Sequence, residues 1–286
     1  MHRHSEGGER LLDIEYSVGE HGYVSLIDYM GNDDRIVEAA RQSTTGDVKD
    51  PETDRALIRY MLDCSHRPHT SPFEMVETVW KVRMPIFVAR QWVRHRTASL
   101  NEYSGRYSVM PEEAFIPTID RLRRGGQNTV NKQGSAPINV DAEEFLEYLQ
   151  DEMITCQEEL FEHYKGNLDG GLSKELARIN LPLSLYTTWM WKIDLHNLFH
   201  FLWLRTDGHA QEEIRVYADI MERIVAGIVP VAYEAWVDFK KEAITLSRIQ
   251  REALLALVAA SQAEDATEET HLTLRDAVRA AVGIKG

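Results

Sequence analysis

Three short stretches rich in apolar residues are predicted to form β-strands. They cover residues 23–30, 76–84 and 185–193. In the second stretch, every other residue from Val76 to Met84 shares one face, because successive side chains of a strand point to opposite sides. This alternation predicts a strand rather than a helix.

Longer stretches between and after these strands have helical periodicity. Asn32 or Asp33, Pro51, Pro85 and Asp194 stand where helices are expected to begin, since asparagine and aspartate cap a first turn and proline is tolerated in it. The longest helix is expected to pack through a stripe of Phe145, Leu149, Ile154 or Met153, Leu160 and Tyr164. The predicted helices cover residues 33–42, 51–62, 86–94, 141–165, 175–180, 195–205, 211–229 and 230–239, with further amphipathic helices at 246–260 and 272–282.

Three stretches have neither pattern. Residues 1–20 begin with MHRHSEGGER and are expected to form a flexible arm. Two prolines and two histidines in residues 66–74 predict an irregular loop. Residues 117–140 are polar and include RLRRGGQNTVNKQGSAP, which favours a mobile connection.

Composition narrows the classes of function. The chain has 286 residues and a formal net charge of -14, which argues against non-specific nucleic-acid binding. Cys64 and Cys156 lie far apart without CxxC spacing, so neither a disulfide framework nor a cysteine zinc site is indicated. The polar N-terminus does not resemble a signal peptide, and no apolar run approaches the ~20 residues that cross a bilayer. We therefore expect a cytoplasmic protein with no nucleic-acid or membrane partner.

The densest chemistry lies in residues 94–106, RHRTASLNEYSGR. Burying unpaired charge is costly, so Arg94, His95 and Arg96 do not suit a core element. Guanidinium groups fork onto phosphate oxygens, which suits a polyanion. The triplet alone favours a plainer alternative, an exposed basic loop paired with the chain's many acids. The whole stretch favours an anion site, because the sequence Ser-Gly-Arg at 104–106 repeats the anion-binding chemistry.

Two histidines support a rival function. His196 and His200 lie one helical turn apart, a spacing that suits a metal ion. A metal-dependent nucleotide hydrolase would use His66, His69, His196 or His200 as ligands. No HExxH pattern and no nearby carboxylate complete the set, so we expect no metal. A non-enzymatic helical protein that binds anions or RNA through the basic loop is a third alternative.

The basic stretch also resembles the signature of the flavin-dependent thymidylate synthases. That signature is RHR, two residues, Ser, one residue, Asn-Glu, one residue, Ser, one residue, Arg. The chain matches it without a gap at Arg94, His95, Arg96, Ser99, Asn101, Glu102, Ser104 and Arg106. The blocks HTSPFE, ARINLPL and RTDGHAQ resemble other blocks of the family, so the resemblance extends over residues 22–243.

This resemblance implies a fold and a reaction. The expected fold is α+β, a mixed β-sheet flanked by helices, in a homotetramer whose active sites form at subunit contacts. The expected reaction is reductive methylation of dUMP to dTMP, with 5,10-methylenetetrahydrofolate as carbon donor and NADPH as reductant through bound FAD. The expected division is an N-terminal arm at 1–20, the synthase domain at 21–244 and a helical C-terminal extension at 245–286.

The resemblance also assigns roles residue by residue. The expected flavin contacts are Ser71, Arg94, His95, Arg96 and Glu102, together with Asp194, His196 and His200, which replace the family's usual Asn, Arg and Asn. The expected contacts to dUMP are Gln91, Arg94, Glu102, Ser104, Gly105, Arg106, Arg178 and Arg205. Arg205 is expected to be catalytic by activating the pyrimidine ring. The plainer alternatives are a salt bridge from Arg178 to Glu175 and another from Arg205 to Asp207.

Overall fold

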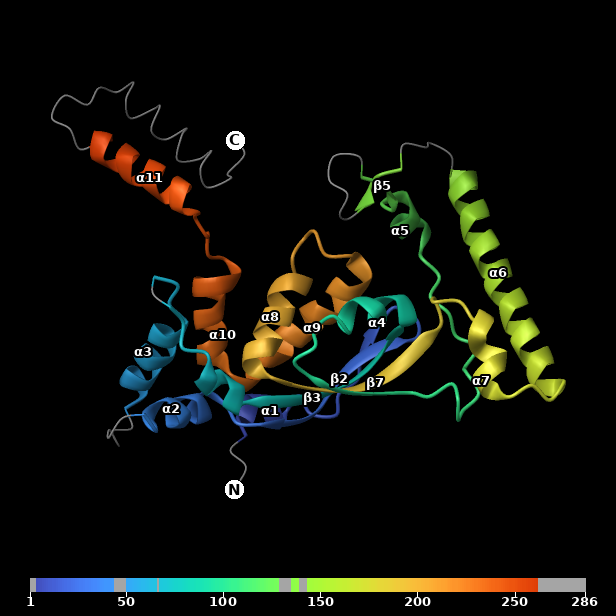
Figure 1. The fold of residues 1–286 in the computed structure, drawn as a ribbon, viewed down its shortest axis with the longest axis horizontal. Helices are drawn as coiled ribbons and strands as arrows, with labels where there is room; N and C mark the ends of the chain where they lie inside the picture. Colours follow the sequence, from blue (N-terminus) through green and yellow to red (C-terminus); the bar gives the residue numbers. More distant parts are fainter. Residues whose placement is uncertain (1–3, 44–49, 66, 129–134, 139–142, 262–286) are drawn as a thin grey trace. The chain divides into compact units, whose positions relative to one another are not determined.

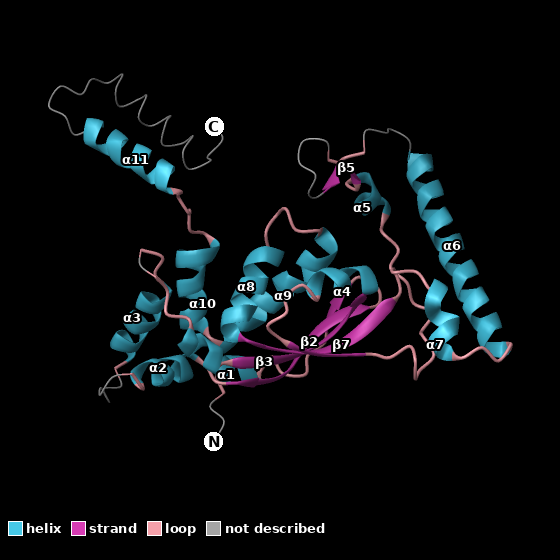
Figure 2. Ribbon diagram, viewed as in Figure 1, coloured by secondary structure: helices cyan, strands magenta, loops and turns pink. Residues whose placement is uncertain are grey.

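The computed structural model describes residues 4–43, 50–65, 67–128, 135–138 and 143–261. The chain divides into two compact units, Met1–Trp236 and Val237–Gly286. Figure 1 labels the helices and strands along the chain, and Figure 2 separates them by type. The first unit contains every described strand and every site residue expected from the sequence.

Five strands of the first unit form one sheet with the order β1-β2-β3-β7-β4. Every pairing between neighbouring strands of this sheet is antiparallel, so the sheet is not mixed as expected. A parallel bridge between Leu12 and Leu26 lies outside the named strands. The α+β class and the three predicted strands are confirmed. The strands are β1 (Tyr16–Val18), β2 (Gly22–Met30), β3 (Glu77–Pro85), β7 (Tyr186–Asp194) and β4 (Ser99–Glu102).

Three helices pack on one face of the sheet, as Figure 1 shows. They are α4 (Ile86–Trp92), α8 (Leu195–Arg205) and α9 (Glu212–Ile228). The predicted alternation of β3 is confirmed, because Trp80 and its neighbours on that face are buried while the opposite face is only half-buried. The helical periodicity of residues 211–229 also predicts an inward stripe at Ile214, Ala218, Met221 and Val225, and all four are buried in α9.

The predicted starts of three further helices, α2, α3 and α10, are confirmed. Asn32 caps α2 (Asp33–Arg41), since its side chain accepts a hydrogen bond from the backbone N–H of Arg35. The next helix, α3 (Pro51–Leu62), begins with proline in its first turn, and so does α10 (Pro230–Trp236).

Asp33, the other candidate cap of α2, has a different partner. Its carboxylate accepts hydrogen bonds of 2.9 Å from the backbone N–H groups of Val231 and Ala232, at the start of α10. Burial raises the pKa of Asp33 to about 6, although the two hydrogen bonds act in the opposite direction. This carboxylate therefore ties the starts of α2 and α10 together.

The first 20 residues do not lie apart from the fold as expected. Ser5 caps α1 (Glu6–Glu9) by accepting a 3.0 Å hydrogen bond from the N–H of Gly8. Strand β1 then pairs with β2 and extends the sheet. The N-terminal segment from Ser5 onward is therefore part of the first unit.

Two stretches predicted as loops contain regular structure. Within residues 66–74, a 3-10 helix, η1 (Ser71–Met75), follows the irregular part. Residues 117–140 contain α5 (Ile119–Arg123) and a small antiparallel pair, β5 (Gly126–Gln127) and β6 (Ser135–Ala136). Residues 66, 129–134 and 139–142 lie outside the described residues.

The long helix is α6 (Glu143–Asp169), and its inward face differs from the predicted stripe. Phe145 is 43% exposed and Met153 is 39% exposed, whereas the neighbouring Leu146 is buried. Its buried residues are Leu146, Phe161 and Tyr164. The stripe was predicted correctly at Tyr164 and wrongly at Phe145. Of the alternatives Ile154 and Met153, Ile154 is half-buried and Met153 is exposed.

The second unit contains a π-helical turn, η3 (Val237–Lys241), and α11 (Arg248–Ser261). The helix predicted at 246–260 is therefore confirmed, and the one predicted at 272–282 lies outside the described residues. None of the described helices is both long enough and apolar enough to span a membrane.

Candidate active site

The basic triplet is positioned by an aromatic cluster beneath it. Trp92, the last residue of α4, is fully buried and stacks on Phe201 of α8 with ring centroids 4.7 Å apart. Trp189 and Trp191 of β7 pack edge-on against Trp92. Because Trp92 is anchored on three sides, the residues that follow it emerge at a fixed place beside α8.

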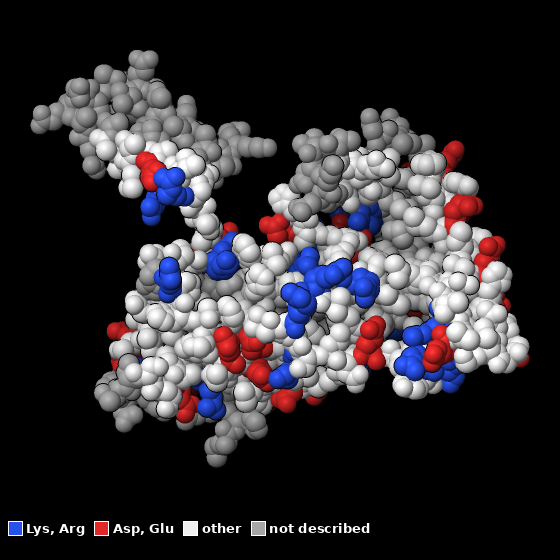
Figure 3. All heavy atoms as spheres, in the orientation of Figure 1, with Lys and Arg blue, Asp and Glu red and all other residues white. Residues whose placement is uncertain are grey.

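Arg94 and Arg96 are both exposed, as a phosphate site requires. Other arginines of the first unit, such as Arg83 and Arg121, are paired with glutamates. Within the described part of the chain, Arg94 and Arg96 form no salt bridge with a carboxylate. Figure 3 shows lysine and arginine side chains gathered over α4 and the neighbouring part of α8. These two guanidinium groups are therefore available to an anionic ligand.

His95 differs from its two neighbours. It is half-buried, packs edge-on against Phe201 at 4.9 Å, and accepts a 3.0 Å hydrogen bond from Nε of Arg205. Burial, followed by the charges of Arg205 and His200, lowers the pKa of His95 to about 4. The expectation that His95 adds positive charge for flavin phosphates is therefore not supported, since the ring is neutral at neutral pH.

Arg205 ends α8 and is half-buried, which lowers its pKa without removing its charge. The alternative partner, Asp207, accepts hydrogen bonds from the backbone and the ring of His209, at 2.7 and 2.9 Å. Asp207 therefore stabilises the turn after α8, and Arg205 is directed toward His95 instead.

A second group of residues that the sequence analysis assigned to a ligand lies around Gly105. A side-chain carbon at this position would lie 3.1 Å from Cδ of Arg178, 3.3 Å from its Nη1 and 2.7 Å from Sδ of Met110. The absence of a side chain at Gly105 thus lets Arg178 lie directly against the backbone between Ser104 and Arg106. The structure brings together the residues that the sequence assigned to the substrate phosphate.

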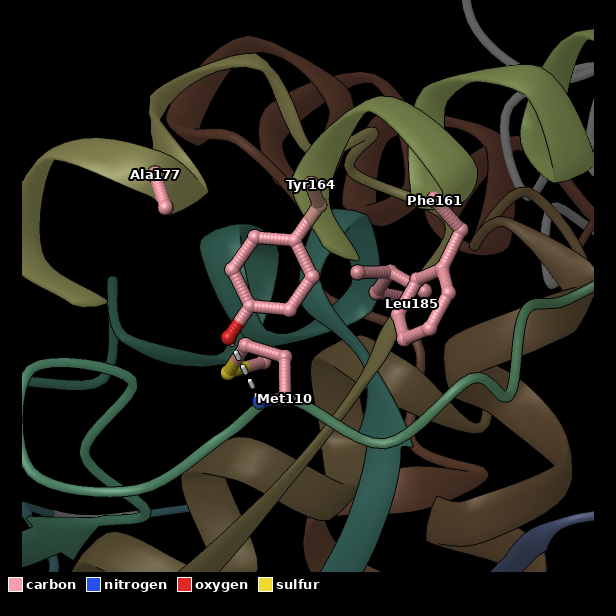
Figure 4. Close-up of a cluster of buried hydrophobic side chains, with 5 residues drawn as sticks. All are labelled: Met110, Phe161, Tyr164, Ala177 and Leu185. Atoms are coloured by element: carbon pink, nitrogen blue, oxygen red, sulfur yellow. Dashed lines mark hydrogen bonds between the residues drawn. The ribbon is translucent and has the colours of Figure 1, made fainter. Parts of the chain in front are cut away.

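A small hydrophobic cluster supports this arrangement (Figure 4). The hydroxyl of Tyr164 accepts a 3.0 Å hydrogen bond from the backbone N–H of Met110. Phe161 of α6, Ala177, next to Arg178, and Leu185, next to β7, complete the cluster. The cluster joins α6, the segment after β4 and the short helices α7 (Lys174–Ala177) and η2 (Arg178–Asn180).

Ser104, Arg106 and Arg178 surround Gly105 and are called the cradle below. Glu175 lies beside this cradle but pairs with Arg106, not with Arg178. The distance from Nε of Arg106 to Oε2 of Glu175 is 3.2 Å, and both side chains are exposed. Lys174 donates a 3.0 Å hydrogen bond to the backbone carbonyl of Tyr107. Exposed ion pairs are weak, so an anion can replace Glu175 at Arg106 at little cost.

Glu102 lies at the end of β4, the edge strand that pairs with β7. Its Oε1 accepts a 2.7 Å hydrogen bond from the hydroxyl of Thr187, which is only 3% exposed. Our reading of the sequence missed Thr187. The available signal was a threonine two positions before Trp189, on the buried side of an alternating strand.

Gln91 is connected by a series of hydrogen bonds to α9 and α5. Its amide donates a hydrogen bond to Gln211, whose own amide donates to Glu213 at 2.7 Å. Glu213 in turn accepts a 2.6 Å hydrogen bond from Arg121 of α5. Gln211 belongs to the RTDGHAQ block, but no role was predicted for it.

Ser71 and the start of α8 lie outside this group of contacts. Ser71 lines a hollow of about 700 Å³ together with His69 and Tyr60, and the RHR triplet does not line it. Asp194 caps α8 by accepting from the backbone N–H of Asn197 at 3.0 Å.

The two histidines of α8 do not complete a metal site. His196 is half-buried, and the ring of His200 lies 6.1 Å from that of His95. Among the residues that the structure describes, His/Cys/Asp/Glu side chains form no group of three or more that could hold a metal ion.

Comparisons with known proteins define the class. Residues 25–231 match the family described as thymidylate synthase complementing protein. The flavin-dependent thymidylate synthase of Ruegeria pomeroyi is 44% identical over 272 residues, which cover 93% of this chain and 86% of the relative. That of Dictyostelium discoideum is 47% identical over 258 residues, 87% of this chain and 81% of the relative. The chain is an enzyme that belongs to the flavin-dependent thymidylate synthase family.

A solved structure supports the fold assignment. The UMP/dUMP methylase PolB from Streptomyces cacaoi, bound with 5-Br dUMP, has a TM-score of 0.68 and is 33% identical in sequence. The match covers 77% of this chain and 96% of that chain.

Proposed function

We propose that this enzyme converts dUMP to dTMP by reductive methylation, with 5,10-methylenetetrahydrofolate as carbon donor and NADPH as reductant through bound FAD. The observation that carries the proposal is the placement of Arg178 against Gly105, which forms a cationic cradle within the matched signature. The relatives are named for flavin-dependent thymidylate synthesis, and the solved neighbour for methylation of UMP and dUMP.

The residues present fit a flavin dinucleotide. Arg94 and Arg96 are exposed and, among the described residues, lack a carboxylate partner, so their guanidinium groups can bind the phosphates. Glu102 is held by Thr187 and offers a carboxylate oxygen to a ligand hydroxyl or amide. Bound FAD supplies the hydride chemistry that no side chain provides.

The chain's own residues bind and polarise the nucleotide. Ser104, Arg106 and Arg178 surround Gly105 and would hold the dUMP phosphate through charge-assisted hydrogen bonds. Arg205 then lies at the pyrimidine and stabilises negative charge on the ring as the ring is activated. A guanidinium suits this role, because it stays charged and offers parallel donors.

This chemistry assigns no role to a cysteine nucleophile. Cys64 and Cys156 are both exposed, and neither adjoins a matched block. Activation by Arg205 therefore stands in place of attack by a thiolate.

The proposal is tested by measuring dTMP formation from dUMP with folate, NADPH and FAD each omitted in turn. All three omissions should abolish product formation, and UMP in place of dUMP tests the discrimination of the sugar. We also propose that the enzyme is cytoplasmic and forms a homotetramer. Light scattering of the same preparation tests the homotetramer by measuring the mass of the assembly. Product formation that persists without added or bound flavin would contradict the proposal.

A further inference from the structure

We propose that His95 is the hydrogen-bond acceptor that orients Arg205 toward the pyrimidine ring, and that it does not serve as a cationic ligand of the flavin phosphates. This inference rests on the proposed function, because it assumes that Arg205 acts on the ring. It gives the central residue of the RHR triplet a different role from that of the two arginines that flank it.

The first argument is the direction of the contact. Nε of Arg205 lies 3.0 Å from Nε2 of His95. A guanidinium can only donate, so Nε2 of His95 must carry a lone pair, and the ring proton must be on Nδ1. A protonated His95 would present a second donor to Arg205 and would break this contact.

The second argument is what the contact leaves available on Arg205. The guanidinium is planar and rigid, and its Nε edge is occupied by His95. The terminal Nη1 and Nη2 groups then remain for a ligand as a pair of parallel donors. A uracil that has lost the N3 proton offers a matching pair of acceptors, the N3 nitrogen and a neighbouring carbonyl oxygen. His95 therefore selects the edge of Arg205 that can stabilise the activated ring.

The third argument is that the surroundings hold the imidazole still and neutral. His95 packs against Phe201, which is fully buried and also stacks on Trp92. Burial lowers the pKa of His95 to about 4, and the neighbouring Arg205 and His200 act in the same direction. A neutral ring on a fixed platform is a good orienting acceptor and a poor phosphate ligand.

Two substitutions separate the alternatives. His95→Gln keeps an acceptor near the position of Nε2 but can never be a cation, whereas His95→Lys keeps a cation but has no acceptor. If His95 orients Arg205, the glutamine variant should lose no more than about threefold in kcat, and the lysine variant about 100-fold, as expected when a reacting group is misplaced. Flavin content should remain close to wild type in both variants.

The measurements are kcat and KM for dUMP, dUMP binding by calorimetry, flavin content and reduction of the bound flavin by NADPH. The inference predicts that His95→Lys lowers kcat and dUMP affinity but leaves NADPH-dependent flavin reduction near normal. Loss of flavin by the glutamine variant, with retention of flavin and turnover by the lysine variant, would overturn it. Wild-type protein that forms no dTMP would instead refute the proposed function, because this result does not depend on His95.

Discussion

A methyl group added at Gly105 is expected to weaken dUMP binding selectively. In Gly105→Ala, the new carbon would lie 3.1 Å from Cδ of Arg178 and 2.7 Å from Sδ of Met110. Optimal carbon contacts are roughly 3.5–4.0 Å, so a neighbour must move by several tenths of an ångström or more. Met110 is 7% exposed and its backbone is tied to Tyr164, whereas Arg178 is half-buried on a flexible stem. The side chain of Met110, which makes the closest contact, must shift, and we expect the side chain of Arg178 to be displaced as well.

The size of the effect follows from the contact that is lost. A hydrogen bond to a charged group contributes about 1.5–3 kcal/mol, which corresponds to roughly 10- to 100-fold in affinity. Calorimetric titration of the flavin-loaded enzyme with dUMP should show this loss, and KM for dUMP should rise accordingly. Flavin content should not change, because Arg94 and Arg96 are not involved.

Two further variants make this prediction sharp. Gly166→Ala is the matched control, because a side-chain carbon at Gly166 in α6 meets nothing within 4 Å. Arg178→Ala should weaken dUMP binding on its own, and adding Gly105→Ala to it should cost little more, since the two changes act on one contact. Full additivity of the two substitutions, or unchanged dUMP affinity in folded Gly105→Ala, would refute the reasoning.

Three more predictions follow from the same structure. Thr187→Val removes the hydrogen bond to Glu102 and should weaken ligand binding about fivefold, whereas Thr187→Ser should not; equal affinities of the two variants in dUMP and FAD titrations would contradict the role of the hydroxyl. Arg94→Ala and Arg96→Ala should each lower flavin affinity about tenfold or more. Flavin retention after dialysis measures this loss, with the variant Arg223→Ala dialysed in parallel as the control. Full retention of flavin by both arginine variants would show that these residues are not part of the site. Asp33 has its pKa raised to about 6 in the folded state from an ordinary 3.8, so its contribution to stability is full at low pH and is lost as the pH rises through 6. The unfolding temperature of wild type minus that of Asp33→Asn should therefore fall between about pH 4 and about pH 7, and a constant difference would disprove the assigned pKa shift.

The elements predicted correctly are those whose burial pattern depends on their own sequence. The alternation of β3 and the stripe of α9 specify an inward face whatever the partner is. In α6 the apolar residues Phe145 and Leu146 are adjacent, so either could face inward. The choice of Leu146 is made by packing partners elsewhere in the chain, which the helix sequence does not contain.

The N-terminal segment was mispredicted for a similar reason. The segment begins with the polar MHRHSEGGER, yet a side-chain carbon at Gly7 would lie 2.6 Å from the carbonyl oxygen of Gly227 in α9. The glycine is therefore needed for close packing of α1 on α9, because any larger residue would push the two helices apart. A contact between positions so distant in sequence leaves no local pattern.

The candidate site shows the same limit. The signature located the arginines and the cradle around Gly105, because these residues are close in sequence or belong to a matched block. The neutral state of His95 and its role as hydrogen-bond acceptor could not be predicted in this way. It depends on Phe201 and Arg205, which surround the ring only after α8 has packed beside α4.

The pairing of β7 with both β3 and β4 also bears on the synthesis of the chain. β4 carries part of the signature, and its neighbour in the described sheet is β7, which is made much later. A ribosome-bound chain that ends before Tyr186 therefore has the signature arginines but no strand to support β4. Because such distant pairings form late, nucleotide binding should be acquired only toward the end of translation. Until then, the edge of β3 that β7 covers is open to pairing with other chains.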